Sequence, residues 1–240
     1  MARKPSSKPS RTSPQLRSSS TGTKSGKVVE IGEAGRQSLR IIAGEWRGRK
    51  IPFATVAGLR PTQDRVRETL FNWVASLIPG ATCLDLFAGT GALGLEALSR
   101  GAKQVNFVDL SVIATSALND NLKQLPIAEG QVAKVEQMSS FDWLRHYKAL
   151  STTSEPMKPY DLVFLDPPFT LALMPDMLIA LFDSQCLSPK AVIYVEQAQP
   201  LTDLSLPQGW TLHRSKKAGQ VFYGLISCWV ELTLKVVNAA

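Results

Sequence analysis

The sequence predicts an α/β fold in which helices cover both faces of a mostly parallel sheet. Three observations lead to this fold class. Short apolar strands alternate with helix-forming segments from residue 82 to residue 183. A glycine-rich turn joins the first of these strands to its helix. The last two strand-like segments lack a helix between them, which predicts an antiparallel hairpin at the edge of the sheet.

The N-terminal segment is expected to be a disordered basic tail, which we place at residues 1–35. Residues 1–27 hold seven Lys or Arg residues and no Asp or Glu. The same stretch is rich in Ser, Thr and Pro and offers almost nothing that a core could bury. A loose electrostatic contact with RNA and an organelle transit peptide both fit this composition. The glycines, serines and prolines of this stretch would break the amphipathic helix of a transit peptide, so the contact with RNA is favoured.

Residues 36–80 predict a small extension made of a β-hairpin and a helix. The hairpin would turn at Gly44–Gly48, and the helix would start at Pro61-Thr62, with Thr62 as its N-cap, and end near Leu77. Residues 36–67 hold eight Lys or Arg residues against two acids, a net charge of +6. A basic module of this kind suits an RNA held by its phosphates, and a solvated basic face is the alternative.

Trp46 lies among the arginines of this extension, where it could stack on a nucleobase or cap the apolar side of the hairpin. The RNA contacts expected from the extension are Arg40, Trp46, Arg47, Arg49, Lys50, Arg60, Arg65 and Arg67.

Residues 81–240 form the predicted enzyme domain. Its strands are expected near residues 82–87, 104–109, 131–136, 161–166, 190–196, 210–216 and 221–233, and its helices near 91–100, 112–124, 140–149 and 171–183. Gly219 lies between the last two strands and marks the turn of their hairpin.

The first strand of this domain contains Asp85 and is followed by the turn Gly89-Thr90-Gly91. Glycine lets the backbone approach a ligand closely. The second strand ends in Asp109, whose carboxylate could accept hydrogen bonds from both ribose hydroxyls of an adenosine. This order of a strand, a glycine turn, a helix and a second strand that ends in an acid predicts a nucleotide-binding site.

The glycines also fit the dinucleotide pattern G-x-G-x-x-G, with Asp109 twenty residues after Gly89. Asp85 argues against a dinucleotide, because its carboxylate would lie where a pyrophosphate binds at the helix N-terminus. A sulfonium ligand with a free ammonium group would favour that carboxylate. The loop therefore better predicts a site for S-adenosylmethionine, and a purely structural turn is the alternative.

A second motif follows the apolar strand at Asp161–Leu165 and reads Asp166-Pro167-Pro168-Phe169. Two prolines cannot continue a central strand, so the chain must turn there. A carboxylate, a backbone carbonyl and an aromatic face are left at the end of the strand, where open parallel sheets bind ligands. This set suits a planar base with an exocyclic amine, and a plain strand stop is the alternative.

Carrying both motifs, the chain resembles the Rossmann-like methyltransferases that act on exocyclic amines. The segments Arg40–Lys50, Leu59–Trp73 and Ala218–Val221 resemble the RsmD family more specifically. The resemblance covers about residues 38–234 and implies a seven-stranded class I methyltransferase fold. It further implies methylation of guanine N2 in small-subunit (16S) ribosomal RNA, free or within an assembling subunit, by a monomer with S-adenosylmethionine as cofactor.

The resemblance also assigns the site residues. Asp166, Pro167, Pro168 and Phe169 are expected to hold the target base. The cofactor is expected to contact Asp85, Phe87, Ala88, Gly89, Thr90, Gly91, Asp109, Leu110, Gln137 and Met138.

Two other functions remain open at this stage. An N6-adenine methyltransferase could use the same Asp-Pro-Pro-aromatic motif but would usually need an added target-recognition region. A non-catalytic RNA-binding or assembly factor could retain the fold, although the intact acids weigh against it.

Composition sets the remaining expectations. The apolar fraction of 44% suits a globular core, and no apolar run approaches the ~18 residues of a membrane helix. The three cysteines, Cys83, Cys186 and Cys228, form no metal or redox spacing. We expect core thiols, no metal, no membrane contact and a reducing, cytoplasmic location.

Overall fold

The computed structural model describes residues 37–53, 64–150 and 158–228. The basic tail, Arg60 and the expected N-cap Thr62 lie outside these residues. Among the described residues, no helix combines the length and the apolar character needed to cross a membrane. All three cysteines are buried free thiols, as the sequence predicts.

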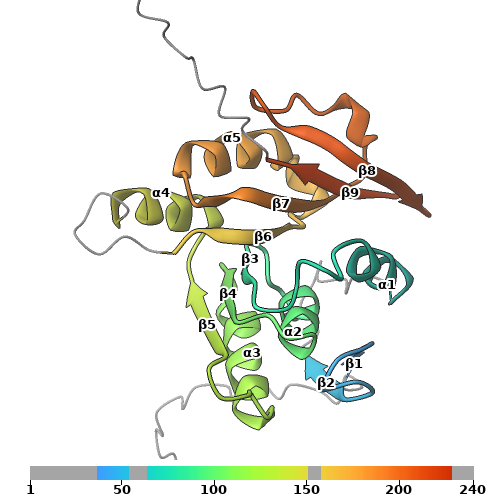
Figure 1. Ribbon diagram of the computed structural model, residues 1–240, viewed down its shortest axis with the longest axis vertical. Helices are drawn as coiled ribbons and strands as arrows, with labels where there is room; N and C mark the ends of the chain where they lie inside the picture. The colour runs from blue at the N-terminus through green and yellow to red at the C-terminus, as the bar shows by residue number, and fades with distance from the viewer. Residues whose placement is uncertain (1–36, 54–63, 151–157, 229–240) are drawn as a thin grey trace, which may run out of the picture. The chain divides into compact units, whose positions relative to one another are not determined.

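A seven-stranded sheet forms the centre of the fold, in the order β5-β4-β3-β6-β7-β9-β8 (Figure 1). The first five strands of that order run parallel to their neighbours. The strands are β3 (Thr82–Asp85), β4 (Gln104–Asp109), β5 (Val132–Gln137), β6 (Tyr160–Leu165), β7 (Leu187–Gln197), β8 (Thr211–Ala218) and β9 (Val221–Ser227). The first six strands begin and end close to their predicted bounds, so the alternation in the sequence identified the sheet correctly. β9 begins at its predicted start and ends at Ser227, while the predicted end near residue 233 lies outside the described residues.

The last two strands confirm the predicted edge hairpin. β9 pairs antiparallel with β7 on one side and with β8 on the other, and β8 is the edge strand. Gly219 has a φ of 59°, a conformation that glycine adopts without strain at such a turn.

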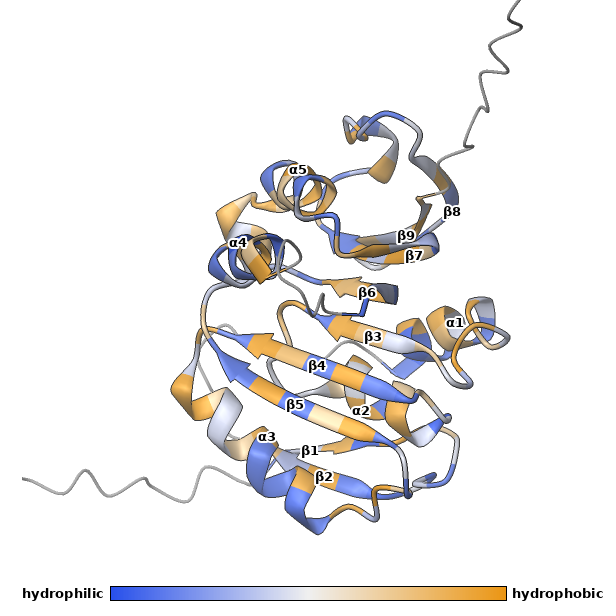
Figure 2. Ribbon diagram, turned by 60° about the vertical axis from the view of Figure 1, so that its left-hand side comes forward, coloured by the Kyte–Doolittle hydropathy of each residue, from blue (hydrophilic) through white to orange (hydrophobic). Residues whose placement is uncertain are grey.

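Helices cover both faces of the sheet (Figure 1). One core cluster joins the sheet to the N-terminal extension, α1, α2 and α3, and the other joins it to α4 and α5. β3, β4 and β6 are largely hydrophobic in Figure 2, as expected of strands buried between two layers. The helices are α1 (Asp64–Trp73), α2 (Ala92–Ser99), α3 (Val112–Gln124), α4 (Ser140–Leu150) and α5 (Met174–Ser184).

The predicted N-terminal hairpin consists of β1 (Gln37–Arg40) and β2 (Lys50–Phe53), paired antiparallel. Its apolar side chains belong to the same core cluster as α1 and α2. Trp46 is only 1% exposed, and its indole N–H donates to the Pro126 carbonyl oxygen at 3.1 Å. Trp46 therefore caps the apolar side of the hairpin, and the prediction that it contacts RNA is wrong.

Helix α1 ends at Trp73, four residues before its predicted end near Leu77. The chain turns at Val74–Gly80, so Leu77 is 39% exposed and Ile78 takes the buried position instead. Apolar spacing alone suggested a longer helix, because Leu77 continues the i, i+4 series past the point where the turn breaks it.

Arg67 of α1 is fully buried and serves the fold. Its Nη2 donates to the Arg40 carbonyl oxygen at 2.8 Å and to the Asp64 carboxylate at 2.6 Å, and its Nη1 lies 3.7 Å from Glu96. A guanidinium without solvent access cannot bind a phosphate. The prediction that Arg67 contacts RNA is therefore also wrong.

Glu96 of α2 is equally buried and holds the hairpin to the sheet domain. Its carboxylate accepts the backbone N–H groups of Ile42 and Ala43 at 2.8 and 2.9 Å. Arg100 donates to the same carboxylate at 2.8 Å. The extension is thus attached by a buried ionic network as well as by apolar packing.

Candidate active site

Four carboxylates gather where neighbouring parallel strands end. Asp85 closes β3, Asp109 closes β4, Asp166 follows β6, and Glu196 lies near the end of β7. The carboxyl ends of parallel strands meet at one edge of a sheet, which is the ligand-binding edge of open α/β folds. The acids expected from the sequence are therefore brought together by the order of the strands.

Asp85 is 3% exposed, and its carboxylate accepts the backbone N–H of Gly94 at 3.1 Å. Burial raises the pKa of Asp85 to about 7, although the Gly94 hydrogen bond opposes the rise and nearby Asp109 adds to it. A buried acid of this kind would be ionised more readily beside a cation. The site can therefore accept a positively charged ligand group next to Asp85.

Backbone hydrogen bonds from both sides hold the Asp109 carboxylate at the glycine loop. The Gly89 N–H donates to Oδ2 of Asp109 at 2.7 Å, and the Ser111 N–H donates to Oδ1 at 2.8 Å. Gly91 has a φ of 77° directly before α2, and an added Cβ would lie 2.6 Å from Leu118. The loop thus requires glycine at this position, and it fixes the orientation of the Asp109 carboxylate.

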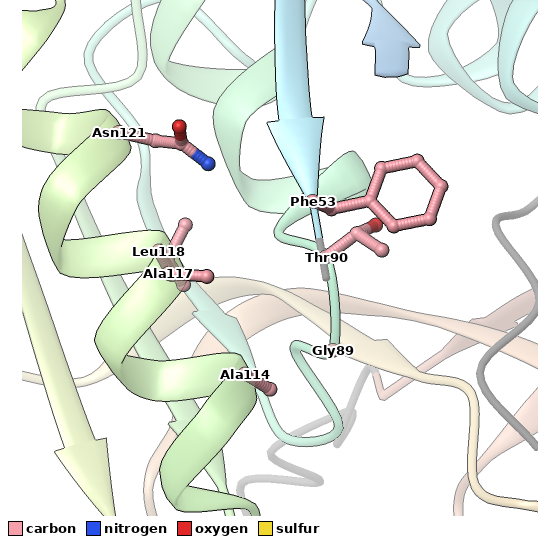
Figure 3. Close-up of a pocket in the computed structure, with 7 residues that line it drawn as sticks. All are labelled: Phe53, Gly89, Thr90, Ala114, Ala117, Leu118 and Asn121. Carbon is pink, nitrogen blue, oxygen red and sulfur yellow. The ribbon is translucent and has the colours of Figure 1, made fainter. Parts of the chain in front are cut away.

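A small hollow separates this loop from α3 and the end of β2. Gly89 and Thr90 face Ala114, Ala117, Leu118 and Asn121 along one side of the helix, and Phe53 at the end of β2 lies beside Thr90 (Figure 3). Asn121 also donates to the Pro52 carbonyl oxygen at 2.8 Å. The N-terminal hairpin therefore contributes a wall next to the glycine loop.

Apolar side chains flank Asp109 on the open side. Leu110 is 70% exposed directly after it, and the backbone N–H of Met138 donates to the Asp109 carbonyl oxygen at 3.1 Å. Phe87 and Met138 are half-buried, while Gln137 is exposed at the end of β5. Leu110 and Met138 can offer two apolar surfaces to a flat ring beside an acid that can hold a ribose.

Asp166-Pro167-Pro168-Phe169 stops β6 as the sequence predicts. A short 3₁₀ turn at Phe169–Leu171 follows, and Phe169 is 38% exposed. The two prolines and Phe169 line a hollow of about 270 Å³ together with residues of the α5 start and the β7 end. Asp166 directly precedes this lining in the chain, and the partly exposed Phe169 presents a ring to solvent.

The exposed part of the predicted RNA surface is smaller than expected. Arg40, Arg47, Arg49, Lys50 and Arg65 are exposed, in contrast to Trp46 and Arg67. Among the described residues these five cations remain available for phosphates. Their role stays a prediction.

Edge strand β8 adds basic residues that the sequence did not single out. His213, Arg214, Lys216 and Lys217 are exposed along it. Arg214 and Lys216 lie 5.9 and 5.7 Å from the ring centre of Trp73 at the end of α1. Four basic residues within five positions of the sequence could have indicated this surface. Only the fold places them beside α1.

A seven-stranded sheet of this order, with acids at the ends of β3 and β4 and an Asp-Pro-Pro-Phe turn after β6, defines a class I methyltransferase fold. A family model described as Conserved hypothetical protein 95 matches residues 39–227. The chain belongs to this family, the RsmD family.

Two curated relatives share this family's sequence over most of their length. Ribosomal RNA small subunit methyltransferase D of Escherichia coli is 42% identical over 192 residues, 80% of this chain and 91% of the relative. The protein of that name from Haemophilus influenzae is 44% identical over 187 residues, 78% of this chain and 92% of the relative.

Solved structures agree with the fold. The Escherichia coli protein yhhF superposes with a TM-score of 0.67 and 38% identity, covering 81% of this chain and 100% of that one. TrmN from Thermus thermophilus, at 19% identity and a TM-score of 0.52, covers 68% of this chain and 48% of that one, and it shows the shared fold alone.

Proposed function

We propose that this protein transfers a methyl group from S-adenosylmethionine to the N2 amine of a guanine in small-subunit ribosomal RNA. The observation that carries the proposal is the placement of an Asp-Pro-Pro-Phe turn beside the two cofactor acids Asp85 and Asp109, on one edge of one sheet. The names of the curated relatives support ribosomal RNA as the substrate.

The residues at the strand ends fit the cofactor. Asp85 is a buried carboxylate with a raised pKa of about 7, which suits an ammonium group. Asp109 is oriented by the Gly89 N–H, and exposed Leu110 can cover a base. When bound, S-adenosylmethionine would supply an activated methyl group on a sulfonium.

The chain's own contribution to the reaction is positioning. The amine of guanine is a weak nucleophile because its lone pair is delocalised into the ring. The Asp166 carboxylate and the Pro167 carbonyl oxygen can accept hydrogen bonds from the two N–H groups of the amine. These bonds hold the amine and direct its lone pair toward the methyl donor. Positive charge develops on this nitrogen as it reacts, and the Asp166 carboxylate stabilises that charge.

Phe169 provides the stacking face for the target base. Stacking of a base on an aromatic side chain contributes about 1–3 kcal/mol in single-strand binders. A base paired within a helix cannot reach such a ring. We therefore infer that the target guanine is unpaired or flipped out when it reacts.

Mapping the modified nucleotide tests the proposed function directly. Small-subunit ribosomal RNA from a strain that lacks the protein would be incubated with the purified chain and S-adenosylmethionine, digested and analysed by mass spectrometry. The proposal expects N2-methylguanosine at one position. A methylated adenine would favour the N6-adenine alternative, and binding of RNA without transfer would favour the assembly factor.

Replacing Asp109 by alanine should weaken cofactor binding and leave the fold intact. Hydrogen bonds to a charged acceptor contribute roughly 1.5–3 kcal/mol, so the Kd for S-adenosylmethionine should rise at least ~10-fold. Titration calorimetry measures this change, with the exposed acid Asp183 of α5 replaced by asparagine as the control. An unchanged Kd would remove Asp109 from the cofactor site.

Replacing Asp85 by asparagine should change stability and binding in opposite directions. The folded state raises the pKa of Asp85 from 3.8 to about 7, so the folded protein holds a proton that the unfolded chain releases. Its stability should therefore fall as the pH rises from about 4 to about 7 and then level off. The asparagine variant should lose that slope and melt at a higher temperature at pH 8.

The same substitution should weaken the binding of S-adenosylmethionine, because the ammonium group loses its anionic partner. Thermal unfolding and calorimetry between pH 5 and pH 8 measure the two effects. A variant that is both less stable and equally tight at pH 8 would contradict the assigned role.

The exposed cations of the hairpin should carry the RNA contact. Replacing Arg47 and Arg49 together by alanine should lower kcat/KM for RNA by ~10-fold or more at moderate salt and reduce the salt slope of binding by about two. Cofactor affinity should not change. The matched control replaces Arg145 of α4 and Lys190 of β7, which are equally exposed cations on other elements. Equal losses in both pairs would point to nonspecific charge.

A further inference from the structure

Glu196 is a second carboxylate beside the acceptor pair Asp166 and Pro167, and the proposed transfer does not use it. β6 and β7 run parallel, with Leu165 opposite Val195. Asp166 directly follows β6 and Glu196 directly follows Val195, so the two acids lie at the same end of two strands that are only ~4.8 Å apart.

The Glu196 side chain is held in one orientation. The Tyr194 hydroxyl donates to its Oε1 at 2.5 Å, and Glu196 is 4% exposed. Burial raises the pKa of Tyr194 well above its usual range, and the charges of Glu196 and Asp166 raise it further. Tyr194 is therefore a permanent donor that lies close to both carboxylates.

Glu196 also borders the hollow where the target base is expected. Pro167, Pro168 and Phe169 line this hollow, and Glu196 and Gln197 are part of the same lining. A base whose amine reaches Pro167 would therefore have Glu196 at its adjoining edge.

Purine bases differ in the ring atom N1, which lies next to the position of the N2 amine. Guanine carries N1–H directly beside its N2 amine, so it presents donors on neighbouring atoms. Adenine and 2-aminopurine present an unprotonated N1 with a lone pair. A fixed carboxylate accepts a hydrogen bond from guanine N1–H and repels that lone pair.

We propose that Glu196 is the residue that selects guanine, by accepting the ring N1–H while Asp166 and Pro167 hold the amine. This inference rests on the proposed function, because it assumes that a purine N2 amine is the methyl acceptor. Glu196 acts on base choice and takes no part in bond formation, and Tyr194 positions it.

A base analogue tests the selection. A synthetic RNA fragment that spans the mapped nucleotide would carry either guanine or 2-aminopurine there. 2-Aminopurine keeps the reacting amine but lacks N1–H. The wild-type protein should prefer guanine by about 10- to 100-fold in kcat/KM, since a buried charged acceptor would otherwise face a lone pair.

Glu196→Gln should reverse this preference. The Tyr194 hydroxyl would still donate to the amide oxygen, which turns the amide N–H₂ toward the base. That group repels guanine N1–H and donates to N1 of 2-aminopurine. The guanine rate should fall and the 2-aminopurine rate should rise, a change that a merely structural role for Glu196 would not produce.

Two further variants complete the test. Asp183→Asn should keep the wild-type ratio. If Glu196→Gln fails to fold, Tyr194→Phe, which removes only the hydroxyl that fixes Oε1, should lower the ratio at least ~3-fold. An unchanged ratio in the folded variants overturns the role of Glu196 and leaves N2 methylation standing. A wild-type protein that methylates no guanine N2 rejects the proposed function instead.

Discussion

Replacement of Asp166 by alanine is expected to lower the rate of methyl transfer by at least ~10²–10³-fold, in line with the loss of a preorganised electrostatic group at a reacting centre. The reason is its position. Asp166 follows β6 at the edge where Asp85 and Asp109 end their strands, and the Asp-Pro-Pro turn holds it there. A single-turnover assay measures the chemical step separately from RNA release.

Cofactor affinity should respond much less, because the ribose acid is Asp109 and the acid placed for the ammonium group is Asp85. The Kd of Asp166→Ala for S-adenosylmethionine should stay within about threefold of wild type, which calorimetry measures. Asp166→Asn supplies the matched variant, since its amide oxygen still accepts a hydrogen bond but carries no charge. Single-turnover rates near wild type in the alanine variant would exclude Asp166 from catalysis.

Replacement of Glu96 by alanine should destabilise the fold by about 3–5 kcal/mol, because it leaves the buried Arg67 with Asp64 as its one remaining charged partner and removes the partner of Arg100. The same change removes the acceptor of the Ile42 and Ala43 N–H groups, which attach the hairpin to α2. Urea unfolding measures the loss. Glu68→Ala on the exposed face of α1 is the control and should change stability by less than ~0.5 kcal/mol.

This prediction also separates structure from RNA binding within the basic N-terminal extension. Glu96→Ala should lower the unfolding midpoint, whereas Arg47→Ala and Arg49→Ala should lower RNA affinity without that effect. A Glu96 variant as stable as wild type would show that the hairpin is held without the Glu96 network, by apolar packing and by its hydrogen bonds to Ser99.

The sequence predicted the sheet because its information is local. Strand and helix periodicity, the glycine turn and the two prolines after β6 act over a few residues, so they could be interpreted without knowing the neighbours. The helix end at Trp73 was predicted less well, because an apolar Leu77 continues the pattern although the chain has already turned.

The acids of the candidate site were also found from the sequence. Asp85, Asp109 and Asp166 each lie in or directly after a predicted parallel strand, and parallel strands end at one edge of a sheet. Membership in the family and the similarity to small-subunit methyltransferases confirm the fold and the class of enzyme that these motifs predicted.

By itself, then, the sequence determined the order of the elements and the acids at the strand ends. Only the tertiary structure decided which charged and aromatic side chains face solvent. Arg67 is buried between two counter-charges, Asp64 three positions before it and Glu96 29 positions further along the chain, and Trp46 is buried against a carbonyl of Pro126. Glu196 and Asp166 come to the same end of neighbouring strands because β6 pairs with β7, a long-range contact that no local pattern of residues encodes.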